Sequence, residues 1–317
     1  LQTVCHIAPL QNYLLSKEHT SACSVQKEGG MCALCLLEDH MHEVLKGTNA
    51  ALHPKAVLLR IKQLGGKNIQ LGRQEDAHEF LLHFLDACHK AALQTSLTGS
   101  NTLSPIVKRT TLIHQIFGGY LRSQVTCLEC KHVSNTFDPF VDLSLEVRNV
   151  ATLEKALEAF TKSETITGPV RYKCRRCQNP VDVAKRFSIH TPPHLMAFQL
   201  KRFEFSQGNR GKIVKPVAFG TSLDLARFMS NPKAEAKYRL YAVIVHSGQS
   251  AKSGHYFAFI RHSSGSWYQF NDEVVRAASE QQVLRQQAYL LFYEAASVPT
   301  SGAAPQTRAA VASEPVR

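Results

Sequence analysis

Apolar positions recur along the chain at two periods, one helical and one strand-like. Residues 1 to about 95 read as mostly helical. The clearest helix is QEDAHEFLLHFLDACHKAAL, starting at Gln74, because its apolar side chains recur at three- and four-residue steps and form one stripe. Glu75 and Asp76 in its first turn suit the positive end of the helix dipole. The pattern therefore predicts a helical N-terminal region.

Strand-like segments dominate from about Ile113 to Val147 and return after a second helical stretch, TLEKALEAFTKSE, from Thr152. The later segments are HLMAFQLKRFEF, YRLYAVIVHSG, HYFAFIRH, SWYQFNDEVV and AYLLFYEA. Helices first and strands later are typical of an α+β chain rather than of alternating βαβ units. Residues 96–104 are small and polar and read as a loop. Residues 297–317 lack bulky apolar side chains, so we expect a disordered tail there.

Charge and composition narrow the classes of partner. The chain has 37 Lys and Arg against 25 Asp and Glu, a net charge of +12 that favours acidic partners such as nucleic acid. No block of five or more like charges occurs, so we interpret the surplus as a basic soluble surface and do not expect a nucleic-acid partner. The sequence contains no run of eighteen apolar residues, so we predict no membrane-spanning helix. The first residue is Leu1 and nothing near it resembles a signal peptide, so we expect translation to begin upstream.

Six of the nine cysteines fall into three CxxC pairs. Without a secretory signal, this usage indicates a reducing compartment and metal binding rather than disulfides. Cys127 with Cys130, and Cys174 with Cys177, lie in strand-and-turn contexts where one tight turn presents two thiolates to one ion. We predict that the two pairs form one structural Zn²⁺ site with four cysteine ligands. Two unrelated pairs of reduced cysteines are the alternative, because the pairs are far apart in sequence.

The third CxxC pair is Cys32 and Cys35, in GGMCALCLLEDHM. No further cysteine pair is left to complete a site with four cysteines. His40 and His42 are possible additional ligands, but we prefer to interpret these cysteines as small apolar side chains on a core face.

The stretch SGHYFAFIR, residues 253–261, places His255 after a glycine and at the start of an apolar strand. A polar loop leads from it to WYQFNDEVV, so the two segments are predicted to form a hairpin in which Asn271 or Asp272 lies across from His255. A histidine oriented by an amide or a carboxylate is the base half of a nucleophilic site. A lone histidine in a strand is more often structural, so the prediction depends on this combination.

The chain resembles the ubiquitin-specific protease (USP) family of cysteine peptidases from Leu1 to about Glu294. The stretches that carry the resemblance are, in order, LGRQEDAHEFL, GGYLRSQVTCLEC, FDPFVDLSLEV, YKCRRC, TPPHLMAFQLKRF, KPVAF, YRLYAVIVHSG, SGHYFAFIR, WYQFNDEVV and AYLLFY. The resemblance implies an α+β, papain-like fold with a thumb, a palm and zinc-ribbon fingers that grip ubiquitin. It implies one catalytic domain over 1–296, with a mostly helical thumb in 1–105, the zinc fingers within 106–190 and the palm strands in 191–296.

The same resemblance implies a role for individual residues. His255 matches the general base, and Asn271 matches the orienting position, where the adjacent Asp272 can share or take the role. An amide orients the imidazole but cannot stabilise imidazolium by charge, whereas Asp272 could. Asp76 and Glu79 match acidic positions that face the arginine-bearing ubiquitin tail; solvated helix faces are the alternative. The four cysteines of the first two pairs match the finger zinc ligands.

The start of the chain departs from the family pattern. The family's nucleophile lies in a Gly-Asn-x-Cys box that opens a helix, and LQTVCHIAPLQNYLLSKEHT resembles the segment after that box. We therefore expect the nucleophile upstream of Leu1, because Cys5 lacks the preceding Gly and Asn.

These features lead to expectations about activity and partners. The complete product is expected to be a thiol-dependent deubiquitinase, and the 317 residues alone are expected to be inactive. A non-catalytic ubiquitin-binding member is the alternative. We expect a monomer that binds ubiquitin and ubiquitinated proteins, has no membrane partner, and resides in the cytoplasm or the nucleus, the nucleolus included.

Overall fold

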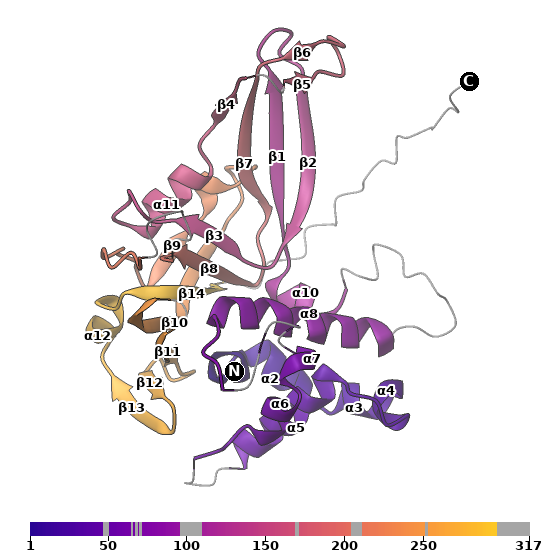
Figure 1. The fold of residues 1–317 in the computed structure, drawn as a ribbon, viewed down its shortest axis with the longest axis vertical. Helices are drawn as coiled ribbons and strands as arrows, with labels where there is room; N and C mark the ends of the chain where they lie inside the picture. The colour runs from indigo at the N-terminus through magenta and orange to yellow at the C-terminus, as the bar shows by residue number, and fades with distance from the viewer. Residues whose placement is uncertain are drawn as a thin grey trace.

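The computed structural model describes residues 1–46, 51–64, 66, 69, 72–95, 110–168, 171–203, 211–250 and 253–296. The predicted loop 96–104 and the predicted tail 297–317 lie outside these ranges. Figure 1 shows three parts: the N-terminal helices, a large mixed sheet beside them, and a narrow antiparallel sheet that projects away from both. None of the described helices is both long and apolar enough to cross a bilayer.

The helical part consists of short helices packed around two longer ones. Its elements are α1 (Gln2–Cys5), α2 (Ala8–Leu15), α3 (Glu18–Ala22), α4 (Ser24–Lys27), α5 (Ala33–Leu45), α6 (Lys55–Leu59), α7 (Ile61–Leu64), α8 (Ala77–Thr95) and α10 (Leu112–Phe117). The helix predicted from Gln74 begins at Ala77, because Asp76 Oδ1 accepts the backbone N–H of His78 at 2.7 Å and caps it.

Helix α10 corrects the expectation of strand-like structure from Ile113. The side chain of Thr111 accepts the backbone N–H of His114 and caps the helix. Ile113, Ile116 and Phe117 are buried together at three- and four-residue spacing. A cap and one apolar turn therefore decided the local structure, and the strand begins only at residue 119.

The large sheet has the strand order β13-β12-β11-β10-β14-β8-β3, with β9 added to β10. Its strands are β3 (Leu143–Glu146), β8 (Leu195–Lys201), β9 (Ser222–Asp224), β10 (Lys237–Ser250), β11 (Ser253–Arg261), β12 (Trp267–Asn271), β13 (Val274–Ala278) and β14 (Ala288–Ala295). The short helices α11 (Leu153–Phe160), η1 (Ala226–Phe228) and α12 (Glu280–Leu284) accompany it. Pairing is antiparallel except between β3 and β8.

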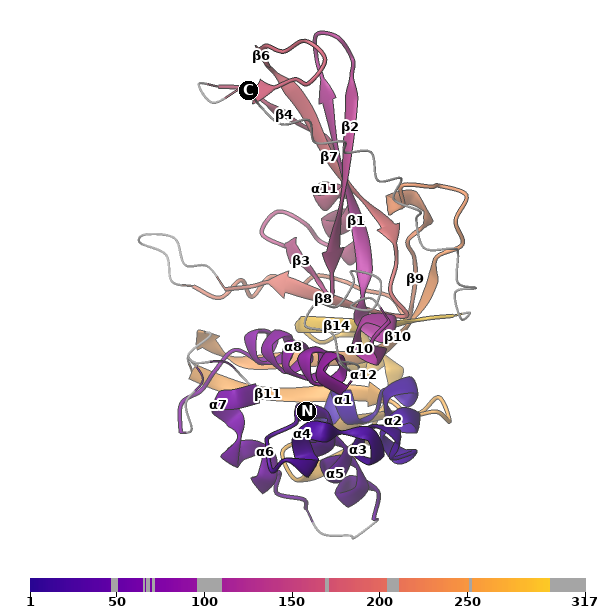
Figure 2. The ribbon, with the colours of Figure 1, turned by 90° about the vertical axis from the view of Figure 1, so that its right-hand side faces the viewer.

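Both faces of the central strands are buried, which explains their continuous apolar runs. On β14, Leu290 and Phe292 pack with the helical part, while Leu291 and Tyr293 belong to a second core on the opposite face. The same alternation holds for β8 and β11, and for β10 on either side of a register shift at Tyr241. Figure 2 shows the helices along one side of these strands. The sheet therefore supports the hairpin β11–β12, which lies one strand in from the β13 edge.

The projecting sheet has the order β2-β1-β7-β4, from β1 (Gly119–Cys127), β2 (Val133–Phe140), β4 (Glu164–Ile166) and β7 (Val183–Thr191). At its tip lies a separate two-stranded sheet, β5 (Tyr172–Lys173) with β6 (Pro180–Val181). The tip has a very small apolar core, whose buried members are Cys127, Cys174, Val181 and Val183. Packing alone provides little stabilisation there.

A fully buried cation closes the end of β8. Arg202 is 0% exposed, and its guanidinium donates to the backbone oxygens of Ala288, Ile213 and Lys215. Burial lowers the pKa of Arg202 to about 10, so the group stays protonated at neutral pH. These bonds join the end of β8 to the segment around residues 213–215 and to β14, which is 86 positions away in sequence.

We expect Arg202→Met to destabilise the fold by about 3 kcal/mol, because it leaves one buried and two part-buried carbonyl groups without their donor. Urea unfolding followed by tryptophan fluorescence measures the effect, since the single tryptophan, Trp267, lies in the same sheet. The exposed Arg276 on β13 gives the control, Arg276→Met, whose effect should stay within about 0.5 kcal/mol. Equal effects of the two substitutions would contradict the role given to Arg202.

Candidate functional site

The hairpin β11–β12 brings His255 and Asn271 together. His255 lies near the start of β11, opposite Ser247 of β10, and Asn271 is the last residue of β12. The Nε2 atom of His255 lies 2.5 Å from Asn271 Oδ1. The His255 side chain is 44% exposed, so the ring is held at one nitrogen and open to approach.

This contact fixes the tautomer of the imidazole. Because the amide oxygen of Asn271 can only accept, Nε2 of His255 carries the proton. The lone pair is then on Nδ1, which makes no hydrogen bond to any of the described residues. A neutral histidine with a free basic nitrogen and an oriented ring is arranged to take a proton from a nucleophile.

Asp272 is placed less favourably than Asn271. It lies in the tight turn between β12 and β13, with a left-handed backbone (φ 50°). Its Oδ2 is 3.8 Å from His255 Nε2, and its side chain is 71% exposed. Solvent screens such a pair, so the carboxylate contributes little to orientation. Asn271 is the orienting partner in this geometry, and Asp272 is a secondary neighbour.

Gly254 allows the backbone ahead of His255 to pass close to β10. Its φ is +153°, and an added Cβ would lie 2.4 Å from both His246 Nε2 and Ser247 O. The N–H of Gly254 donates to Gln74 Oε1 at 2.6 Å. Sequence reasoning assigned no role to Gln74, yet this bond ties the segment before α8 to the strand that carries His255.

Asp76 caps α8 and also makes hydrogen bonds to a residue of the large sheet. Both carboxylate oxygens accept from the hydroxyl of Tyr289, at 2.7 and 2.6 Å. Gln199 Nε2 donates to the same Tyr289 oxygen at 3.0 Å. Burial, followed by the Asp76 charge, raises the pKa of Tyr289, so the phenol remains a donor. Sequence reasoning missed this link, although a tyrosine within the apolar run AYLLFY signals a buried partner.

Glu79 and Asp76 differ in their surroundings. The Glu79 side chain is 46% exposed, and its Oε1 is 3.8 Å from His83 Nε2. Asp76, by contrast, is half-buried and fully engaged. Glu79 is therefore the carboxylate free to meet an external cation, while Asp76 fixes the position of α8 against the sheet.

The first helix lies beside the His255 hairpin. Helix α1 contacts β11, the side chain of Gln2 donates to the backbone oxygen of Asp272 at 3.0 Å, and the His6 ring packs edge-on against Phe270. Cys5 in this helix is only 2% exposed, and burial raises its pKa to about 11. Its thiol is therefore neutral and shielded, as a structural cysteine would be.

The two predicted CxxC pairs meet at the tip of the projecting sheet. Cys127 is the last residue of β1 and Cys130 lies in the turn after it, while Cys174 and Cys177 lie in the turn between β5 and β6. The Sγ atoms of Cys127 and Cys177 are 3.9 Å apart, and those of Cys130 and Cys174 are 3.8 Å apart.

The two turns repeat one geometry. In each, the residue after the second cysteine is left-handed, Lys131 at φ 59° and Gln178 at φ 61°. In each, the N–H of that residue donates to the carbonyl of the first cysteine. A tetrahedral ion with bonds of about 2.3 Å to sulfur needs sulfur atoms about 3.8 Å apart. The four thiolates fit such a metal ion, with no further position open.

Comparison with known proteins gives the family. The family model described as ubiquitin carboxyl-terminal hydrolase matches residues 1–293. Human ubiquitin carboxyl-terminal hydrolase 42 is 43% identical over 294 residues, which make up 92% of this chain and 22% of that protein. Ubiquitin carboxyl-terminal hydrolase 23 of Arabidopsis thaliana is 38% identical over 295 residues, 92% of this chain and 33% of that protein. The chain thus spans a third or less of the length of these two relatives.

Comparison with solved structures points to the same family. The SAGA Ubp8/Sgf11/Sus1/Sgf73 DUB module bound to ubiquitin aldehyde matches with a TM-score of 0.81 at 28% identity, covering 93% of this chain and 66% of that chain. The predicted α+β, papain-like fold of the ubiquitin-specific protease type is confirmed. The chain belongs to the ubiquitin carboxyl-terminal hydrolase family.

Proposed function

We propose that the protein is a thiol-dependent deubiquitinase that hydrolyses conjugates at the C-terminal glycine of ubiquitin. The observation that carries the proposal is the pair His255–Asn271, in which the amide holds Nε2 and leaves Nδ1 as the base. In such a site Nδ1 removes the proton from a cysteine thiol, the thiolate attacks the carbonyl carbon, and imidazolium returns the proton to the leaving amine.

The nucleophile in this proposal is a cysteine that precedes Leu1. None of the nine cysteines in the 317 residues has an Asn two positions before it, and Cys5 is buried with a neutral thiol. The contact of Gln2 with Asp272 supports the proposal, because residues joined ahead of Leu1 would enter beside His255. On this reading the 317 residues alone do not hydrolyse ubiquitin conjugates.

Ubiquitin recognition is assigned to two regions. The exposed carboxylate of Glu79, on the first turn of α8, is available to an arginine of the ubiquitin tail. Asp76 positions that turn through Tyr289. The projecting sheet acts as the fingers, and the four cysteines at its tip hold a structural Zn²⁺ that supports them.

A ubiquitin probe with a C-terminal electrophile tests the activity. The protein extended upstream of Leu1 to include a Gly-Asn-x-Cys segment should form a covalent adduct, seen as a mass increase of one ubiquitin. The 317-residue chain should form none, because the reacting thiolate is missing.

Two outcomes would contradict the proposal. Labelling of the 317-residue chain would place the nucleophile among its own cysteines. Failure of the folded, extended protein to react, with retained binding of ubiquitin, would favour a non-catalytic ubiquitin-binding protein. The Cys5→Ser variant of the extended protein is the control and should label like the parent, since Cys5 is a buried packing residue.

A further inference from the structure

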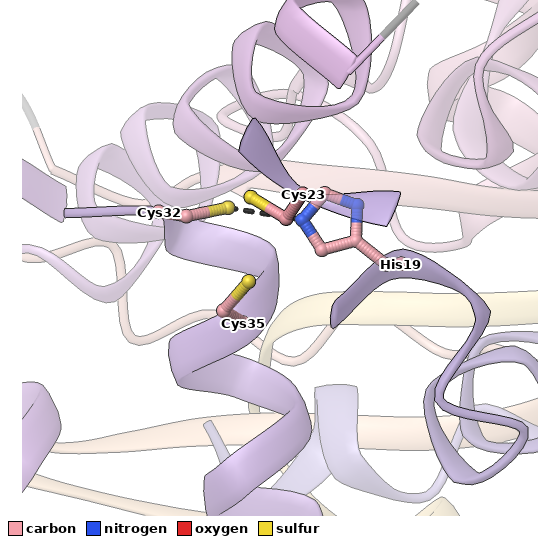
Figure 3. Close-up of side chains that lie close together, drawn as sticks. All are labelled: His19, Cys23, Cys32 and Cys35. Atoms are coloured by element: carbon pink, nitrogen blue, oxygen red, sulfur yellow. Dashed lines mark hydrogen bonds between the residues drawn. The ribbon is translucent and has the colours of Figure 1, made fainter. Parts of the chain in front are cut away.

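Four potential metal ligands meet in the helical part, far from the fingers. His19 comes from α3, Cys23 from the junction of α3 and α4, and Cys32 and Cys35 from the start of α5. Figure 3 shows their side chains converging on one point. Their ligand atoms all lie within 4.8 Å of one another, and His19 Nε2 is 3.0 Å from Cys32 Sγ.

We propose that these four residues form a second structural zinc site, with three thiolates and one imidazole. A tetrahedral zinc ion places its ligand atoms about 3.8 Å apart, so the observed cluster needs only small side-chain adjustments to bind one. All four residues are at most 5% exposed. A buried site with four protein ligands has no position open for water or substrate, so the ion is structural.

Local structure explains why these spacings converge. His19 and Cys23 are four residues apart and lie one helical turn from each other across α3. Cys32 immediately precedes α5 and Cys35 lies in its first turn, where the positive end of the helix dipole favours thiolate. Each pair is therefore a preformed two-ligand unit, and tertiary packing has only to bring two units together.

The alternative is that the cysteines simply fill the core. Thiols do pack as small apolar groups, and Cys23, Cys32 and Cys35 belong to the main hydrophobic cluster of the helical part. Packing does not explain His19, which is 2% exposed and whose Nε2, among the described residues, forms a hydrogen bond only with a thiol, a weak partner. A buried imidazole aimed at three sulfurs is the arrangement of a metal ligand.

A second buried polar group points to the same interpretation. Glu38 lies one turn after Cys35 on α5, is 2% exposed, and its Oε2 has no hydrogen-bond partner in the described parts of the chain. Buried carboxylates of this kind commonly accept from the outer ring nitrogen of a metal-bound histidine. The Glu38 charge acts on the His19 ring, so Glu38 is a candidate supporting group beside the ligand set.

The position of the cluster explains what an ion would do. Helices α3 and α4 have five and four residues, too short to be stable without tertiary links. They pack against α5 and α8. Zinc would join them to α5 and so support α8, which Asp76 caps and whose first turn carries Glu79. The site is independent of the proposed activity.

Zinc analysis of the purified 317-residue chain tests the proposal. We expect two zinc ions per chain, and one after Cys174→Ser with Cys177→Ser, which removes the finger ligands. The double variant Cys23→Ser with Cys35→Ser should also hold one. The control Cys88→Ser changes a fully buried cysteine of the same core that is outside the cluster, and it should keep two. A single zinc in the parent that disappears with the finger ligands would overturn the proposal.

X-ray absorption at the zinc edge gives a second test, whose first measurement uses the parent chain alone. Two sites together supply seven sulfurs and one nitrogen, whereas the finger site alone supplies only sulfur. In the finger double variant, the remaining ion should have three sulfurs and one nitrogen, and His19→Cys added to it should give four sulfurs with zinc retained. A sulfur-only first shell in the parent, or loss of all metal from a finger double variant with intact helical content, would contradict the second site.

Discussion

His255→Ala in the extended protein is expected to lower kcat for release of a fluorescent amine from the ubiquitin C-terminus by about 10² to 10⁴-fold. The loss follows because the contact with Asn271 holds the His255 ring in one orientation and leaves its Nδ1 as the base. KM should change little, since the proposed role of His255 is proton transfer rather than ubiquitin recognition. Steady-state kinetics with saturating substrate separates the two constants.

Variants of the two neighbours distinguish their contributions. Asn271→Ala removes the acceptor at 2.5 Å and should lower kcat by roughly 10-fold or more, because the ring loses its tautomer and orientation. Asp272→Ala removes a screened carboxylate at 3.8 Å and should cost less than about 3-fold. His262→Ala, at an exposed histidine just beyond β11, is the matched control. A His255→Ala protein as active as the control would overturn the base assignment, and a reversed order would make Asp272 the orienter.

The ligand sets show how far the sequence alone could predict the site. The pairing of Cys127 and Cys130 with Cys174 and Cys177 followed from two identical short spacings, because each CxxC turn is a local structure. His19 and Cys23 were not joined to the third pair, since their link depends on how α3 packs against α5. The sequence signal was a histidine and a cysteine four residues apart, ahead of an unpaired CxxC. This signal indicates a metal site only once the tertiary structure brings the four side chains together.

The same distinction holds for the fold. Strands buried on both faces, such as β10 and β14, were predictable because their apolar runs are continuous. Helix α10 was not, because a single turn capped by Thr111 carries too few apolar positions to show a period. The bond between Tyr289 and Asp76 joins residues 213 positions apart, and no pattern along the chain encodes it. Elements with a regular local pattern could be predicted from the sequence, whereas contacts between distant segments were found only in the structure.

Loss of the finger metal is expected to unfold the tip while the large sheet stays intact. The buried members of the tip's core are two ligands and two valines, Val181 and Val183, and the strands β5 and β6 have two residues each. Binding of a structural zinc contributes about 10 kcal/mol or more, far above what two valines supply. In Cys174→Ser with Cys177→Ser, backbone amides near Cys127 and Val181 should therefore exchange at nearly unfolded rates.

Hydrogen exchange followed by mass spectrometry localises the effect. Peptides from β10 and β14, which pack in the large sheet, should keep the protection of the parent because their core does not include the tip. Arg176→Ser is the matched control, since it changes an exposed residue between the same two ligands and leaves both thiolates in place. Full protection of the tip in the cysteine variant would show that packing holds it without metal. Uniform loss of protection, reaching β10, would show instead that the tip and the large sheet unfold as one unit.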